Sequence, residues 1–419
     1  MPTVHTLANG VRVICDPMPG LETIALSVVA GRGARSEGTA ENGWSHLLEH
    51  MVFKGAGPRS SRDIVEAIEA EGGQINAATG YERTSYQVRA LREGLTLGLQ
   101  VCADLVLRPT LDAEDLAREK QVVGQEIAEA ADTPDDLVFE MAQTAAFDGQ
   151  PLGRPILGTP ESIGHATPDA LEAWRKRLYG ADSLVVSVAG AVDEAQLLDL
   201  AERAFADAAP APTQTPEAAR FVGGARPLAK KLEQANLVLM LPAVGARDPD
   251  YFALRLFAEI LGGGMASRLF QEARERRGLA YAVDAYVETY ADVGLLGIFA
   301  GCAARDAVEF AKVAAGEVAG LIARVEPQEL ARAKAQLKAS LFMARESALA
   351  RAEQTAAQVL VFERPLSAAE LAVQIDEVTA QDLRRIGERM LSERRSVAAV
   401  LGPKAALAAA GAFEKSLFH

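Results

Sequence analysis

The pattern of apolar and polar residues predicts short strands that alternate with amphipathic helices in both halves of the chain. Helical periodicity is long and clear at 113–131 and 327–347. Because each strand-and-helix group has one hydrophobic face to cover, the pattern predicts α+β domains of two layers. Apolar or alternating runs of strand length lie at 11–15, 24–29, 84–90, 184–189, 237–241, 293–301 and 397–401.

Similar stretches recur in the same order in the two halves, at offsets between 206 and 214 residues. Each match alone is weak, but four in order at a nearly constant offset are hard to obtain by chance. We therefore expect two homologous two-layer α/β sandwich domains related by internal duplication. The matched pairs are 31–37 with 243–249, 61–73 with 267–279, 115–121 with 329–335, and 167–179 with 379–391.

A change of composition between the two copies predicts the domain boundary. Residues 207–219, DAAPAPTQTPEAA, are rich in Ala, Pro and Thr and lack apolar periodicity, which is typical of a linker. The prediction is an N-terminal domain at 1–206, a linker at 207–219 and a C-terminal domain at 220–419.

Composition narrows the classes of function. The 419 residues are 49% hydrophobic and 24% charged, as in soluble globular proteins. A net charge of −14 disfavours nucleic acid and anionic membranes as partners. The three cysteines lack metal-type or disulfide-type spacing. With no signal or transit pattern at the N-terminus and no apolar run near the ~18 residues of a spanning helix, we expect a cytoplasmic protein.

One short motif carries metal chemistry. In the sequence HLLEH, His46 and His50 lie four residues apart, so on a helix they share a face and can bind one metal ion. Glu49 projects beside them and can reach a metal-bound water without being a ligand. The order of residues, H-x-x-E-H, is that of the inverted zincins. Neutral imidazoles suit Zn²⁺, and a catalytic zinc site needs a third protein ligand. The alternative is a solvated helix face that carries two histidines.

The third ligand is expected to be a carboxylate of the predicted helix 113–131. That helix offers Glu119, Glu126 and Glu129, of which the first two are seven residues apart and share a face. The residues alone leave the choice among the three open.

With these motifs the chain resembles the pitrilysin/insulinase family of zinc peptidases, in its short form related to mitochondrial processing peptidase. The resemblance implies that Glu126, 76 residues after His50, is the third zinc ligand, and that Glu119 is a supporting carboxylate. In GGQINAATGYERTSY, Asn76 and Ala77 would contact the substrate backbone.

The second copy resembles the family's C-terminal domain through LGGGMASRLFQEARERRGLAY. The resemblance implies that Arg274 and Tyr281 bind the substrate carbonyl and take part in catalysis. Neither copy has the other's residues, since no histidine lies in the helix predicted at 251–264 and isoleucines occupy the first-copy positions that match Arg274 and Tyr281.

The resemblance implies a zinc endopeptidase, with one Zn²⁺ per chain, that hydrolyses peptides or small unfolded proteins held in extended form in a closed chamber. It also implies a partner: a second identical chain, with each active site shared between subunits, or a zinc-less paralogue. The rival hypothesis is a non-catalytic scaffold subunit of the same fold. A scaffold has no reason to keep His46, Glu49, His50 and Glu126 together.

Overall fold

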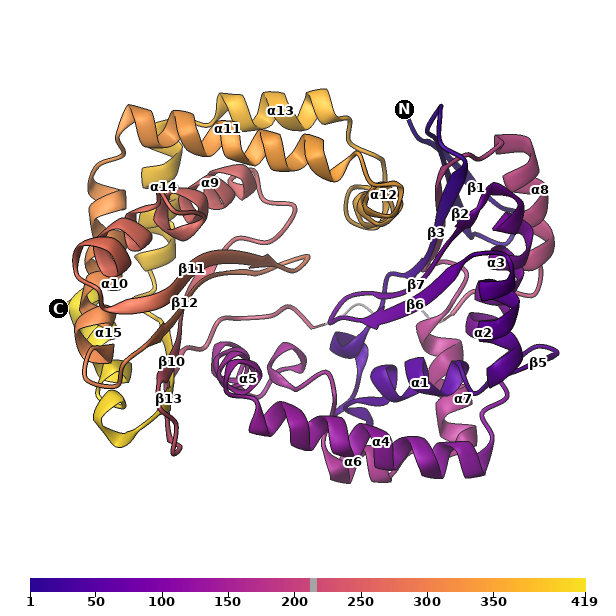
Figure 1. Cartoon of the computed structure of the whole chain (residues 1–419), viewed down its shortest axis with the longest axis horizontal. Helices are drawn as coiled ribbons and strands as arrows, with labels where there is room; N and C mark the ends of the chain where they lie inside the picture. The colour runs from indigo at the N-terminus through magenta and orange to yellow at the C-terminus, as the bar shows by residue number, and fades with distance from the viewer. Residues whose placement is uncertain (212–216) are drawn as a thin grey trace. The chain divides into compact units, whose positions relative to one another are not determined.

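The computed structural model describes residues 1–211 and 217–419, which form two compact units (Figure 1). The first unit comprises Met1–Ala128, Pro155–Glu217 and Phe342–Ser367, and the second comprises Glu129–Arg154, Ala218–Leu341 and Ala368–His419. A single division at 207–219 would place two segments differently: Glu129–Arg154 belongs to the second unit and Phe342–Ser367 to the first. Part of that predicted linker, 212–216, lies outside the described residues.

A six-stranded mixed sheet forms the centre of the first unit, in the order β1-β2-β8-β3-β7-β6. Only β2 and β8 pair in parallel, and β6 lies at one edge, paired to β7. Its central strand β8 is buried along its whole length, which explains its unbroken apolar run LVVSVAG. The strands are β1 (Thr3–Thr6), β2 (Arg12–Pro17), β3 (Thr23–Ala30), β6 (Gln74–Thr79), β7 (Thr84–Leu91) and β8 (Leu184–Gly190).

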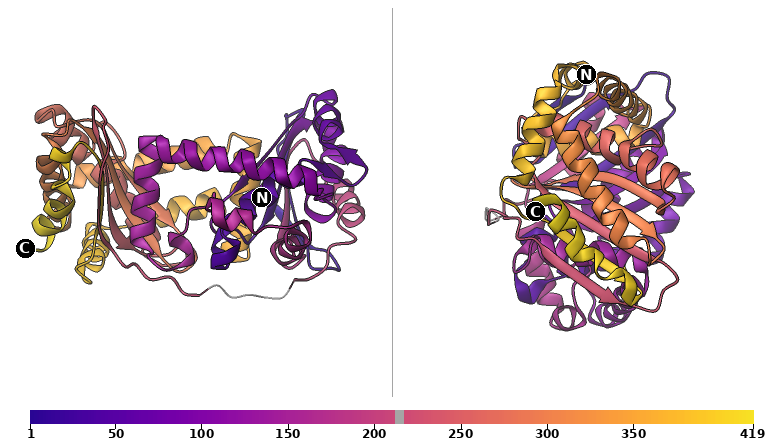
Figure 2. Two further views of the ribbon diagram at one scale, coloured as in Figure 1. Left: turned by 90° about the horizontal axis from the view of Figure 1, so that it is seen from below. Right: turned by 90° about the vertical axis from the view of Figure 1, so that its left-hand side faces the viewer.

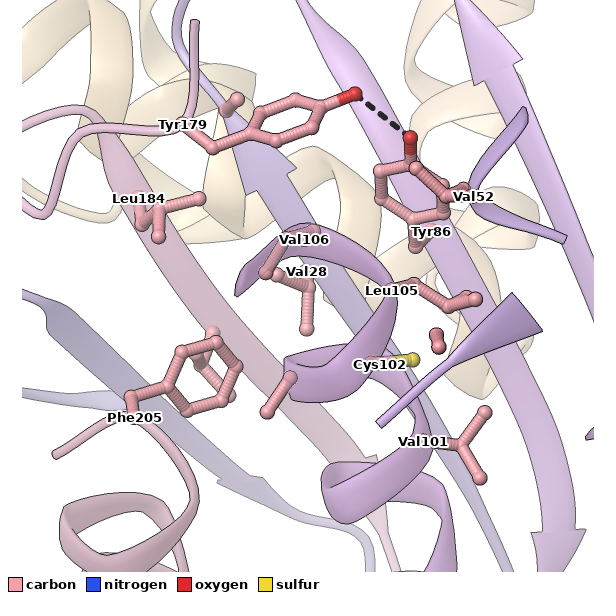
Figure 3. Packing of buried hydrophobic residues seen from close by; sticks show 14 of the residues in the cluster. Val28, Val52, Tyr86, Val101, Cys102, Leu105, Val106, Tyr179, Leu184 and Phe205 are labelled. Carbon is pink, nitrogen blue, oxygen red and sulfur yellow. Dashed lines mark hydrogen bonds between the residues drawn. The ribbon is translucent and has the colours of Figure 1, made fainter. Parts of the chain in front are cut away.

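Helices pack on one face of this sheet and enclose the first hydrophobic core. Val28, Tyr86 and Leu184 of the strands meet Cys102 and Leu105 of a covering helix in this core (Figure 3). Buried cysteines of this kind fit the expectation of small apolar residues, and all three cysteines are free and buried. The helices of this unit include α1 (Trp44–Val52), α2 (Ser61–Ala70), α3 (Leu95–Leu107), α6 (Pro160–Gly164), α7 (Pro168–Leu178) and α8 (Glu194–Ala204), beside a small hairpin of β4 (Gly55–Ala56) and β5 (Arg59–Ser60).

The second unit repeats this architecture around a five-stranded sheet, in the order β11-β12-β10-β13-β9. Each neighbouring pair matches one in the first sheet, including a single parallel pair, β9 with β13. This shared order and the shared fold confirm the predicted α+β class and the duplication. The strands are β9 (Gly224–Ala229), β10 (Ala235–Ala243), β11 (Ala280–Thr289), β12 (Gly294–Cys302) and β13 (Val397–Gly402).

One face of the second sheet is likewise covered by helices, and Figure 2 (right) looks onto this orange and yellow layer. Leu237, Leu239 and Leu241 of β10 point into the core beneath it. In the described parts of the chain, every helix is too short or too polar to cross a lipid bilayer. The helices are α9 (Tyr251–Gly262), α10 (Ala307–Ala323), α11 (Pro327–Ala344), α13 (Ala368–Glu377), α14 (Ala380–Leu391) and α15 (Ala409–Phe418).

The opposite face of each sheet is covered by a helix from the other half of the sequence. Helix α12 (Ala348–Phe362) packs on β2, β3 and β8 of the first sheet. Its Ala356 and Val359 meet Ile14, Val29 and Val185, which alternate with the residues of the main core. In return, α5 (Pro134–Ala146) packs on β9, β10 and β13 of the second sheet. The two equivalent helices are thus exchanged.

Candidate metal centre

Helix α1 presents the two histidines and Glu49 on its partly exposed side. Leu47, Leu48 and Met51 are fully buried in the first core, so the alternate face carries His46, Glu49 and His50. The helix begins after Gly43, whose φ is +86°. A Cβ atom there would come within 2.6 Å of the backbone of Gly158, so only glycine fits this close approach.

A buried carboxylate fixes the start of the same helix. Glu37, 3% exposed, accepts hydrogen bonds from the backbone N–H groups of Gly43 at 2.8 Å and Ser45 at 2.7 Å. Burial raises the pKa of Glu37 to about 7, against the effect of these donors. Two buried donors left unsatisfied would each cost ~1–3 kcal/mol, so Glu37 stabilises the helix start that positions His46. Sequence reasoning missed this residue, which lies outside the motif.

Helix α4 (Ala113–Asp132) supplies a carboxylate to the two imidazoles. Oε2 of Glu126 lies 3.8 Å from Nε2 of His46 and 3.5 Å from Nε2 of His50. One ligand atom from each of the three residues lies within 4.8 Å of the other two. Glu129, the competing carboxylate, is exposed on the next turn. Of the three carboxylates that the sequence left open, Glu126 is therefore the one that forms a group with both imidazoles that could hold a metal ion.

The chemistry of this donor set fits zinc. Oε2 of Glu126 is buried and has no hydrogen-bond partner among the described residues, an arrangement that a bound cation would satisfy. Burial, and then the neighbouring His50, lower the pKa of His46 to about 4. His46 is therefore a neutral imidazole at neutral pH, the form that ligates metal. Two imidazole nitrogens and one carboxylate oxygen match a catalytic zinc site with three protein ligands.

Glu119 holds His50 from the other side. Its Oε2 lies 3.0 Å from Nδ1 of His50, and its Oε1 lies 2.7 Å from Nζ of Lys54. A carboxylate can only accept here, so we assign the Nδ1–H tautomer to His50, which donates its hydrogen bond to Glu119. In this tautomer Nε2 keeps its lone pair on the side of Glu126. Lys54 was not foreseen from the sequence, although it follows His50 by one helical turn.

Glu49 is held by the edge strand of the first sheet. Thr79, the last residue of β6, donates a hydrogen bond from its Oγ1 to Oε2 of Glu49 at 2.5 Å. Burial raises the pKa of Glu49, which brings this carboxyl closer to the neutral range in which a general base works well. Thr79 belongs to the quoted segment GGQINAATGYERTSY, but no spacing rule identified its contact.

Asn76 and Ala77 lie on the same edge strand. Asn76 is exposed, whereas Ala77 is half-buried and packs against the first core. They pair with Gln87 and Tyr86 of β7, so their other side faces no further strand in the described residues.

Arg274 and Tyr281 lie in the second unit, each held by a different neighbour. The guanidinium of Arg274, in the π-helical segment Phe270–Arg276, lies 4.7 Å from the centroid of the Phe270 ring. The hydroxyl of Tyr281, on β11, donates to Oε1 of Gln234. Both side chains are exposed.

Two family models together match most of the sequence. Residues 12–160 match the family model described as insulinase, peptidase family M16, and residues 165–337 match the peptidase M16 inactive domain. An "uncharacterized zinc protease" of Rickettsia bellii is 35% identical over 401 residues, which cover 96% of this chain and 97% of that protein. An "uncharacterized zinc protease" of Streptomyces coelicolor is 33% identical over 408 residues, which cover 95% of this chain and 89% of that protein.

Solved structures share the fold at lower identity. A protease from Helicobacter pylori has a TM-score of 0.89 at 21% identity, over 96% of this chain and 99% of that one. A chain of complex III from Candida albicans has a TM-score of 0.85 at 21% identity, over 99% of each. At this identity the likeness shows the fold alone. The relatives that match along nearly the whole sequence show that this chain belongs to the insulinase family of peptidases, family M16.

Proposed function

We propose that the protein is a zinc-dependent endopeptidase that hydrolyses peptides or small unfolded proteins bound in extended form. The observation that carries the proposal is the meeting of His46, His50 and Glu126, with Glu49 on the same helix face. The rival hypothesis, a non-catalytic scaffold subunit of the same fold, has no need of this complete set.

Each residue of the site has a task in such a reaction. Zinc held by His46, His50 and Glu126 would supply a Lewis acid that polarises the substrate carbonyl and activates water. Glu49 takes a proton from the attacking water on its carboxylate and passes it to the leaving amine. The Thr79 hydroxyl keeps Oε2 of Glu49 in place during both transfers.

The edge strand β6 is the natural place for an extended substrate. It pairs on one side with β7 and ends the sheet order, so its other backbone edge can accept an added peptide strand. Because the same strand carries Thr79, a peptide along it passes beside Glu49. In this mode the backbone of the peptide would pair with the backbone of β6 at Asn76 and Ala77.

Metal content and hydrolysis together test the proposal. We expect the purified chain to contain about one zinc per molecule and to cleave members of a mixed peptide library. A chelator should remove the zinc and abolish peptide cleavage, and added zinc should restore the metal content and the cleavage. Zinc-loaded protein that cleaves nothing, alone or with a partner, would favour the scaffold instead.

We further propose that two copies of the chain share their sites, with Arg274 and Tyr281 of one copy completing the site of the other. The exposure of both side chains supports this assignment. Homodimers of Glu49→Gln and of Tyr281→Phe should each be nearly inactive. After subunit exchange, a mixed dimer holds one intact site, so activity should return to as much as half per mixed dimer.

The exchange itself is checked by native mass spectrometry of differently tagged copies. Confirmed exchange without recovered activity would show that the two motifs act within one chain or that the partner is a different protein.

A further inference from the structure

A pocket of about 450 Å³ lies at the far end of the edge strand from Glu49. It is formed entirely within the first unit, where α2, β6, β7 and the start of α12 approach one another. Its size is within the range of ~300–1,000 Å³ that is usual for ligand sites. We call it the Val65 pocket, and its apolar lining consists of Val65, Ile68, Ile75 and Leu349.

The lining favours an uncharged, apolar occupant. Val65 is an apolar residue on α2 that leaves 41% of its surface exposed, beside the buried Ile68 one turn away. Two of the polar lining residues donate hydrogen bonds to neighbours: Arg89 donates to Gln74, and Gln87 donates to Glu353, which lies outside the lining. The lining itself carries one carboxylate, Glu69, and one guanidinium, Arg89, so its formal charges cancel.

The pocket adjoins the backbone edge on which an extended peptide would lie. Gln74, Ile75 and Asn76 both line the pocket and belong to β6, whose last residue, Thr79, holds Glu49. From Thr79 back to Ile75 and Gln74 is four to five residues. At ~3.3 Å per residue of strand, this corresponds to roughly 13–17 Å along an added peptide.

We propose that the Val65 pocket binds an apolar side chain of the substrate, four or five residues from the bond that is cleaved. The inference rests on the proposed peptidase function. It adds a preference for one side chain to a binding mode that otherwise depends on backbone hydrogen bonds of the substrate. An apolar side chain would remove the exposed surface of Val65 from water, which is the source of the selectivity.

A leucine scan of substrates tests this subsite. The probes are fluorescence-quenched dodecapeptides of Ala, Ser and Thr, in which one Leu or one Glu is placed at each position in turn, and mass spectrometry identifies the cleaved bond. For the zinc-loaded protein, kcat/KM should be at least about tenfold higher with Leu than with Glu at the fourth or fifth position on one side of the bond. This factor follows from the free energy of burying a leucine side chain.

Two variants on exposed helix positions make the test specific. Val65→Lys should reduce the Leu-to-Glu ratio at that position to below about threefold, and the near-isosteric Val65→Thr should reduce it by a smaller factor. Val373→Lys is the matched control, since Val373 is a helical valine, 54% exposed, outside the pocket. This control should keep the wild-type ratio.

Different outcomes separate the subsite from the function. Peptide cleavage without a Leu preference at these positions, or a preference that survives Val65→Lys, would overturn the subsite and leave the peptidase intact. If zinc-loaded protein cleaves neither these probes nor the mixed peptide library, alone or with a partner, the peptidase proposal fails. Fluorescence anisotropy with unquenched probes then decides the subsite: tighter binding of the Leu probes that Val65→Lys removes supports it, and equal binding overturns it.

Discussion

Replacement of Glu49 by glutamine is expected to lower kcat for peptide hydrolysis by roughly two to four orders of magnitude while zinc stays bound. The amide has nearly the shape of the carboxylate and can still accept the hydrogen bond from Thr79. It cannot take a proton from water at neutral pH, so the loss falls on the chemical step. Steady-state kinetics and zinc analysis of the same preparation measure the two effects.

Glu66→Gln is a suitable control for this variant, because Glu66 is an exposed carboxylate on α2 that pairs with Arg62. It should retain wild-type activity and zinc. Loss of stoichiometric zinc from Glu49→Gln would instead make Glu49 a ligand, and the assignment of the base would be wrong.

Glu126→Gln should weaken zinc binding more than any other single carboxylate change on α4. An amide carries no negative charge, and here it would replace the oxygen that faces both imidazoles at 3.5 and 3.8 Å. Glu119→Gln should weaken binding less, by ~10–100-fold, which is typical of a residue that orients a ligand. Glu129→Gln is the matched control, because its exposed carboxylate is three residues further along the same helix.

Competition with a chromophoric zinc chelator gives the three affinities on one scale. The loss of zinc affinity should be largest for the Glu126 variant and smaller for the Glu119 variant. The Glu129 variant should show no measurable loss. If only the Glu129 variant loses metal, the 76-residue spacing from His50 has selected the wrong carboxylate.

The elements with strong local patterns could be predicted from the sequence. Strands β8 and β13 are buried at every position, so their apolar runs stand out. The edge strands β9 and β11 alternate weakly or are largely exposed, so their formation depends on pairing with a neighbour rather than on their own residues. The duplication was visible because both copies keep the same order of elements.

The candidate site divides along similar lines. His46, Glu49 and His50 follow from helical spacing, because all three lie on one element. The choice of Glu126 over Glu129 needed either a family resemblance or the packing of α4 against α1. Three further residues come near the site only through the tertiary fold: Thr79, Lys54 and Glu37. Residues of these types are mostly exposed in proteins, so nothing in the sequence marked them as part of the site.

The exchange of α5 and α12 bears on how such a chain could have arisen. A single ancestral copy with this helix order would leave one face of its sheet bare unless a second copy lent its helix, which is the arrangement of a domain-swapped dimer. In this chain the two copies belong to one polypeptide, and each contributes a helix to the other copy's sheet. Neither half, cut at 207–219, would then carry the helix that covers its own sheet, so the repeat is a unit of descent but not a unit of independent folding.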